Sequence, residues 1–133
     1  VHDIIALGRV QSMIEARDRL DAGTLVGILA DRSLQHDATR AVPFLGAPAS
    51  LPLSPWRVAA LLQRPVFFMA GLYLVANRYA LHFEPVADFS AVAREQRDGV
   101  IDAALRRYTA LLESYCRRAP YYWFNFFDFW QSR

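Results

Sequence analysis

Apolar and polar residues follow each other along the chain in a pattern that predicts both strands and helices. The run 24–30 (TLVGILA) has the length and composition of a strand that is covered on both faces. A helix with a capping-box start at Ser12 and a final Gly23 precedes this run, and a shorter β-branched segment, 3–7, precedes that helix. We therefore expect a right-handed strand–helix–strand unit.

The second half of the chain predicts a hairpin and then a long helix. Segments 65–75 and 79–84 have the composition of strands, joined by a tight turn at Asn77-Arg78. A short helix with Ser54 as its cap comes before them. Between 90 and 118, apolar residues recur at steps of three and four, which indicates an amphipathic helix packed on a core. The members of this stripe are Ile101, Leu105, Tyr108, Leu112 and Tyr115.

Together these patterns predict one α/β domain over residues 1–133. We expect a mixed β-sheet of about four or five strands flanked by helices. No apolar run reaches the roughly 18–20 residues that a membrane-spanning helix needs.

Composition narrows the classes of function. The chain is 54% hydrophobic and 14% aromatic, which is apolar enough to suggest a surface that contacts lipid or protein. A net charge of +2 is too small to indicate binding of nucleic acid. All 15 basic residues are arginine, which suits binding of phosphate or carboxylate, although a compositional bias of the source genome explains the same fact. Cys116 is the only cysteine, so a cytosolic setting fits.

Charged residues follow the run 24–30 directly, at Asp31 and Arg32. A buried strand that ends in charged groups commonly builds a ligand site at the edge of an open sheet. A solvated strand end gives the same pattern. Further along, Phe44 and Gly46 lie in a glycine turn between two prolines, where they either shape a pocket wall or simply pack the turn.

An aromatic tail ends the chain, because eight of the eleven residues from 120 to 130 are aromatic. Such rings either cover a sheet as part of the core or lie at the headgroup level of a membrane. We expect partial burial with an exposed remainder. The candidates for membrane or partner contact are Trp123, Phe127 and Trp130.

Several segments resemble the C-terminal half of bacterial acyltransferases. They are LDAGTLVGILADRS, VPFLGAPASLPLSPWRVAALL, RPVFFMAGLY, YALHFEPV and YWFNFFDFW. The resemblance is to the lysophospholipid acyltransferase superfamily, in the branch of the late acyltransferases of lipid A biosynthesis, and it covers nearly the whole chain. It implies transfer of a fatty acyl group from acyl carrier protein or a coenzyme A thioester to a lipid-like acceptor. The expected location is peripheral, at the cytoplasmic face of the inner membrane.

The catalytic motif of this family, HxxxxD, is absent from the chain. The three histidines, none of which has a carboxylate five positions later, are His2, His36 and His82. In the family, that His is the general base for the acceptor hydroxyl, and the Asp orients it. The resemblance therefore implies a C-terminal portion of a larger domain that is inactive alone. It holds no metal or bound cofactor, and its substrate-binding candidates are Asp31, Arg32, Phe44 and Gly46.

A second hypothesis is a non-catalytic module that binds lipid or a partner protein through the aromatic tail. An HxxxxD motif upstream in the same reading frame would favour the enzyme over this module. In both cases an incomplete sheet would leave an edge strand and apolar surface exposed, which would allow self-association.

Overall fold

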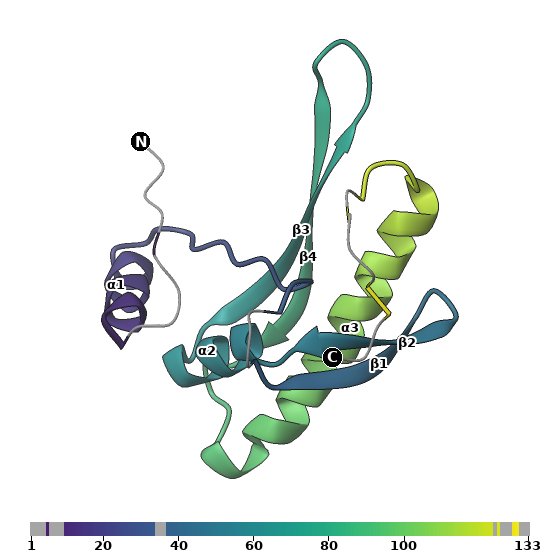
Figure 1. Cartoon of the computed structure of the whole chain (residues 1–133). Helices are drawn as coiled ribbons and strands as arrows, with labels where there is room; N and C mark the ends of the chain where they lie inside the picture. Colours follow the sequence, from purple (N-terminus) through teal and green to yellow (C-terminus); the bar gives the residue numbers. More distant parts are fainter. Residues whose placement is uncertain (1–4, 6–9, 34–36, 124, 126–128, 131–133) are drawn as a thin grey trace.

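The computed structural model describes residues 5, 10–33, 37–123, 125, 129 and 130 (Figure 1). Within these residues the chain has the predicted α/β class. The elements in order are α1 (Val10–Asp21), β1 (Thr39–Phe44), β2 (Ala47–Pro52), α2 (Ser54–Leu62), β3 (Pro65–Tyr73), β4 (Tyr79–Asp88), a short 3-10 turn η1 (Arg94–Gln96) and α3 (Arg97–Arg118). None of the helices in this part of the chain is both long and apolar enough to cross a membrane.

The four strands pair as two antiparallel hairpins, β1–β2 and β3–β4, and not as one mixed sheet. Each hairpin closes through a two-residue turn with positive φ at both central residues, the geometry that matches the natural twist of the strands. In the first turn these residues are Leu45 and Gly46, with φ of 51° and 89°. Gly46 therefore sits in the turn that its sequence context predicts.

The second turn is centred on Ala76 and Asn77, one residue earlier than predicted. The Arg78 N–H donates to the Val75 carbonyl at 3.0 Å and closes it. The predicted strands on both sides are confirmed, and β4 continues four residues further than expected, to Asp88.

The segment 24–30, predicted as a buried strand, does not form a strand. Leu25 and Leu29 are 88% and 72% exposed. An apolar strand needs a neighbour to bond its backbone. No backbone hydrogen bond joins this segment to β3 among the described residues. The predicted strand–helix–strand unit is therefore wrong in its second strand, and most of its first strand, 3–7, lies outside the described residues.

The first helix confirms one predicted end and corrects the other. α1 begins at Val10, so Ser12 lies inside the first turn and is not the cap. At the other end, Gly23 has a φ of +80°. Its N–H donates to the Leu20 carbonyl and the Thr24 N–H donates to the Arg19 carbonyl, both at 3.0 Å. These two hydrogen bonds form the Schellman motif, which a glycine at this position predicts.

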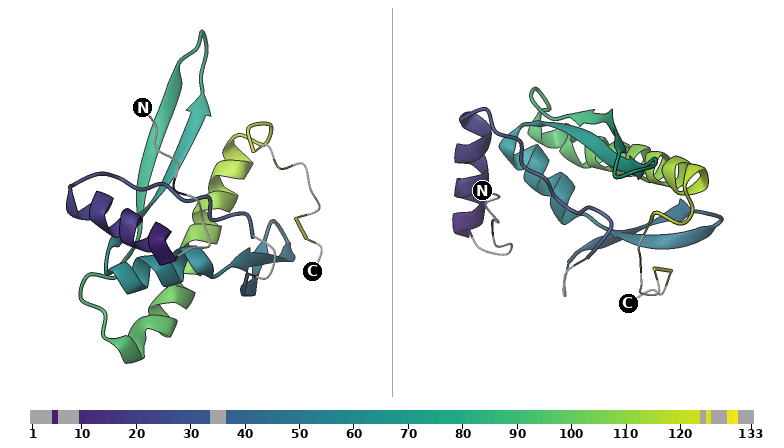
Figure 2. Two further views of the ribbon diagram at one scale, coloured as in Figure 1. Left: turned by 60° about the vertical axis from the view of Figure 1, so that its left-hand side comes forward. Right: turned by 90° about the horizontal axis from the view of Figure 1, so that it is seen from above.

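Helix α3 is the centre of the packing, because it contacts α2, β1, β3 and β4. Its predicted apolar stripe is buried throughout. Figure 2 shows the β3–β4 hairpin running beside α3 and extending beyond it. α2 begins at Ser54, whose hydroxyl donates to Asp37 at 3.2 Å. The prediction that Ser54 caps this helix is therefore wrong, because the residue at the cap position is Leu53.

Candidate functional site

An apolar groove of about 750 Å³ lies between the extended segment 25–31 and strand β3. Residues of α2 and α3 also line it, among them Trp56, Ala59 and Leu112. The volume is within the range of about 300–1,000 Å³ that small-molecule sites occupy. Only two charged residues, Asp31 and Arg64, are among the described residues that line it. The groove therefore suits a long apolar ligand with few polar groups.

Asp31, predicted as a site residue, lies in the wall of this groove. Its Oδ2 accepts a hydrogen bond of 3.3 Å from the indole N–H of Trp123, which also lines the groove. The half-buried carboxylate thus has a fixed partner from the aromatic tail. Arg64, the one cation among the lining residues that the structure describes, forms an ion pair with Asp21 at the end of α1.

Cys116 lines the same groove from α3. Burial raises the pKa of its thiol to about 11, and the negative charges of Asp31 and Glu113 add to that effect. Burial, with a further contribution from Asp31, also raises the pKa of Tyr108 well above its usual value. Neither group is therefore ionised near neutral pH, and Cys116 is not a ready nucleophile.

Phe44 lies in the core and has no exposed surface. Its ring packs against the rings of Trp123, Phe129 and Trp130, at centroid distances of 5.2, 5.3 and 6.1 Å. Trp123 lines the groove and Phe44 does not, so Phe44 supports the groove wall from behind Trp123. Of the two roles that the sequence allows for Phe44, packing of the turn fits this buried position.

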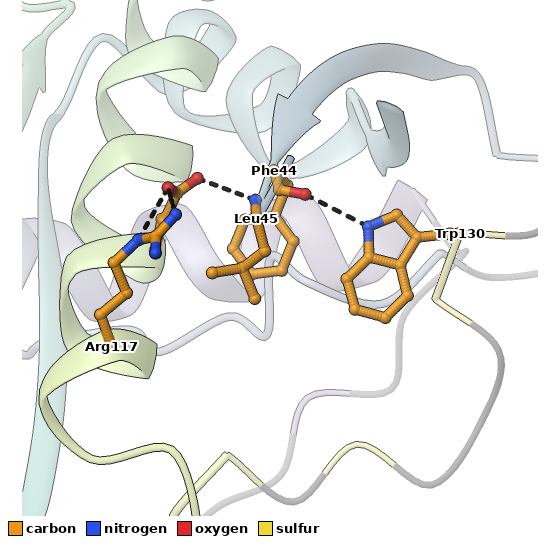
Figure 3. A network of polar contacts seen from close by, with 5 residues as sticks. Phe44, Leu45, Arg117 and Trp130 are labelled. Atoms are coloured by element: carbon orange, nitrogen blue, oxygen red, sulfur yellow. Dashed lines mark hydrogen bonds and ion pairs between the residues drawn. The ribbon is translucent and has the colours of Figure 1, made fainter. Parts of the chain in front are cut away.

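Gly46 is exposed at the tip of the first hairpin, outside the groove lining. The turn beside it is held from α3: the Leu45 N–H donates to Glu113 at 2.9 Å, and Arg117 binds the other oxygen of the same carboxylate at 2.7 Å (Figure 3). The bond from Leu45, followed by that from Arg117, lowers the pKa of Glu113. No local pattern indicates this contact, which joins residues 68 positions apart.

The aromatic tail is partly buried, as its sequence predicts. Phe129 is buried, and Trp130 is 41% exposed while its indole N–H donates to the Phe44 carbonyl at 3.2 Å (Figure 3). Phe127 lies outside the described residues. Arg32 is exposed and is not among the residues that line the groove.

The structure thus brings Asp31, Phe44, Trp123 and Trp130 into one connected region and leaves Arg32 and Gly46 at its surface. Sequence reasoning missed that Tyr108, Leu112 and Tyr115 line the groove. Their helical stripe was the available signal, but it indicates a core and a groove wall equally well.

The described residues hold no cluster of three or more metal-ligating side chains. His82, on β4, has its ring 5.3 Å from that of Tyr115 and is not among the lining residues of the groove. The arrangement can bind and orient an apolar chain. Comparison of the sequence with models of known protein families and with curated proteins gives no match, so the family resemblance stays a prediction.

Proposed function

We propose that this chain forms the acyl-binding part of a membrane-associated acyltransferase. Such an enzyme moves a fatty acyl group from acyl carrier protein or a coenzyme A thioester to a lipid-like acceptor. The observation that supports the proposal is the apolar groove, whose lining carries one carboxylate, Asp31, held by Trp123. Burial of an acyl chain there gains about 0.8 kcal/mol per methylene. The resemblance in sequence supplies the reaction class.

In the proposed reaction, the acceptor hydroxyl oxygen attacks the thioester carbonyl carbon. The new C–O ester bond forms, the C–S bond breaks, and the thiol leaves with the proton that the hydroxyl loses. This step needs a general base, and no histidine is among the described residues that line the groove. We assign the base to an HxxxxD motif of a larger domain. This chain supplies the acyl-binding groove of that domain. The enzyme that we propose works at the cytoplasmic face of the inner membrane.

Binding of a fluorescent fatty acid to the purified chain tests the proposal. Ala70 lines the groove from β3, so Ala70→Trp fills it and should weaken binding at least tenfold. Ala103→Trp is the matched control, because Ala103 lies exposed on α3 and outside the groove. Circular dichroism checks that both variants fold. Equal binding by both variants, or no binding by the wild type, would contradict an acyl site here.

Incubation with dodecanoyl coenzyme A and a hydroxyl acceptor separates binding from catalysis. The chain alone should release no free thiol, because it supplies the binding surface without the base. The alternative, a module that binds lipid or protein through its tail, is favoured by the exposed rings of Tyr121 and Trp130. It predicts that Trp130→Ala abolishes partner binding while the fatty acid still binds.

A further inference from the structure

One face of the β3–β4 hairpin packs on α3, and the opposite face, which is apolar, is largely exposed. On the covered face, Phe68 packs against Tyr108 and Tyr115 of α3, at centroid distances of 5.6 and 5.3 Å. The outer face consists of the odd-numbered residues 67–73 of β3 and 79–85 of β4, which the strand register places in facing pairs such as Met69 with Phe83. We call this surface the outer hairpin face.

None of the eight residues of the outer hairpin face is charged. Five of its large side chains remain 56–64% exposed. These are Phe67, Met69, Tyr79, Leu81 and Phe83. A strand whose outer face met water would carry its polar residues on that face. In β4 the polar residues His82 and Glu84 instead lie on the covered face, beside Tyr115. The pattern indicates that the outer hairpin face contacts an apolar phase.

The free end of the hairpin extends well away from the helices (Figures 1 and 2). Leu74 and Val75 are half exposed there. Below them, the Tyr73 ring packs against Tyr79 at 5.4 Å and against Tyr122 at 6.3 Å. Apolar side chains beside a group of tyrosines are typical of segments that lie at a membrane–water interface.

The charge of the hairpin suits an anionic surface. Between Pro65 and Phe83 there is no acidic residue, and Arg78 stands exposed at the turn. The first acidic residue is Glu84, on the covered face, where it accepts a hydrogen bond of 3.5 Å from the Tyr115 hydroxyl. An arginine at such a tip can bind lipid phosphate.

A bilayer fits the outer hairpin face better than a second copy of the chain does. Its five large exposed side chains offer roughly 500–600 Å², less than the about 800 Å² per partner that a stable protein interface buries. Phe67, Met69 and Phe83 also line the groove. The groove therefore opens beside this face, where an acyl chain could enter from lipid.

We propose that the outer hairpin face and the tip around Arg78 dock the chain on an anionic phospholipid bilayer, with the groove opening toward the lipid. This inference rests on the proposed acyl-binding function and adds the surface that meets the membrane. The contact differs from the one expected through the aromatic tail, because it uses β3 and β4.

Sedimentation with vesicles tests the docking surface. Wild-type chain should bind vesicles of phosphatidylglycerol and phosphatidylethanolamine more tightly than vesicles of pure phosphatidylcholine. Leu81→Glu should weaken binding to the anionic vesicles at least tenfold, while Leu61→Glu, at an equally exposed position of α2, should change it less than twofold. Arg78→Glu should remove the preference for anionic vesicles. Leu81 does not line the groove, so Leu81→Glu should still bind the fluorescent fatty acid.

Four results would overturn the inference. They are no vesicle binding by the wild type, equal loss in the Leu81 and Leu61 variants, loss in Trp130→Ala alone, and a dimer in lipid-free sedimentation that Leu81→Glu dissociates. In each case fatty acid binding in solution remains a separate measurement. Failure of the docking surface can therefore be told apart from failure of the acyl site.

Discussion

The indole N–H of Trp123 donates a hydrogen bond of 3.3 Å to the carboxylate of Asp31. This bond joins residues 92 positions apart and fixes the aromatic tail against the segment that lines the groove. Each residue is therefore a structural partner of the other, whatever ligand the groove takes.

Loss of this bond should destabilise the chain modestly. Trp123→Phe removes the N–H donor but keeps a ring against Phe44 and Phe129, so the free energy of unfolding should fall by about 1 kcal/mol. Urea unfolding followed by circular dichroism measures it. Asp31→Asn with Trp123→Phe should cost less than the sum of the two single variants, because the residues share one interaction. Strict additivity would show that the bond contributes nothing.

The buried ring of Phe44 should be the largest single contribution near the tail. Phe44→Ala removes a fully buried ring and its contacts with three aromatic neighbours. The free energy of unfolding should therefore fall by about 3–5 kcal/mol. Phe83→Ala is the control on the exposed hairpin face, where the loss should stay below about 1 kcal/mol. Similar losses at both positions in urea unfolding would contradict the assignment of Phe44 to the core.

Gly46 should act through its backbone. Its φ of +89° disfavours any side chain, although a Cβ would meet no atom within 4 Å. Gly46→Ala should therefore cost about 1–2 kcal/mol of unfolding free energy. Gly99→Ala, inside α3, should instead stabilise by up to about 1 kcal/mol, because alanine gives the unfolded chain less backbone freedom to lose on folding. Unchanged fatty acid binding by the Gly46→Ala variant would show that the turn does not contact the substrate.

Glu113 should make stability depend on pH. Its pKa lies below its usual value of 4.5, so its contribution is complete above that value and is lost as the pH falls through the lowered pKa. Glu113→Gln should reduce the free energy of unfolding near neutral pH and leave it close to wild type in strong acid. Arg117→Gln should keep much of the pH dependence, since the Leu45 bond is the larger cause. Parallel wild-type and Glu113→Gln profiles would exclude this role.

Cys116 reports on the groove. With a pKa of about 11, roughly one thiol in a thousand is ionised at about pH 8, so iodoacetamide should label folded chain slowly. A bound fatty acid should slow labelling further, because Cys116 lines the groove. Ala70→Trp should remove this protection by the fatty acid. Labelling at the rate of unfolded chain would show that the thiol is open to solvent.

Local signals predicted those parts of the fold whose partners are near in sequence. The glycine turn at Gly46, the strands around Asn77 and the buried stripe of α3 depend on neighbouring residues, so their patterns are informative. The prediction of a strand at 24–30 failed because an apolar composition indicates burial but does not identify the strand that would pair with the segment.

The candidate site was predictable only in part for the same reason. Asp31 was identified from its place after an apolar run, yet nothing near it in sequence points to Trp123. Glu113 lies outside the apolar stripe of α3, and no pattern in the sequence connects it with the Leu45 turn that it holds. Tertiary contacts over such separations leave no periodic pattern in one sequence.

The pairing of each strand with its immediate successor has a kinetic consequence. Strand pairing in each hairpin, β1–β2 and β3–β4, can start at the turn without first closing a long loop. Chains dominated by such short-range contacts fold faster than those with parallel crossovers. Stopped-flow refolding should therefore show both hairpins gaining structure early, with docking onto α3 as the slower event.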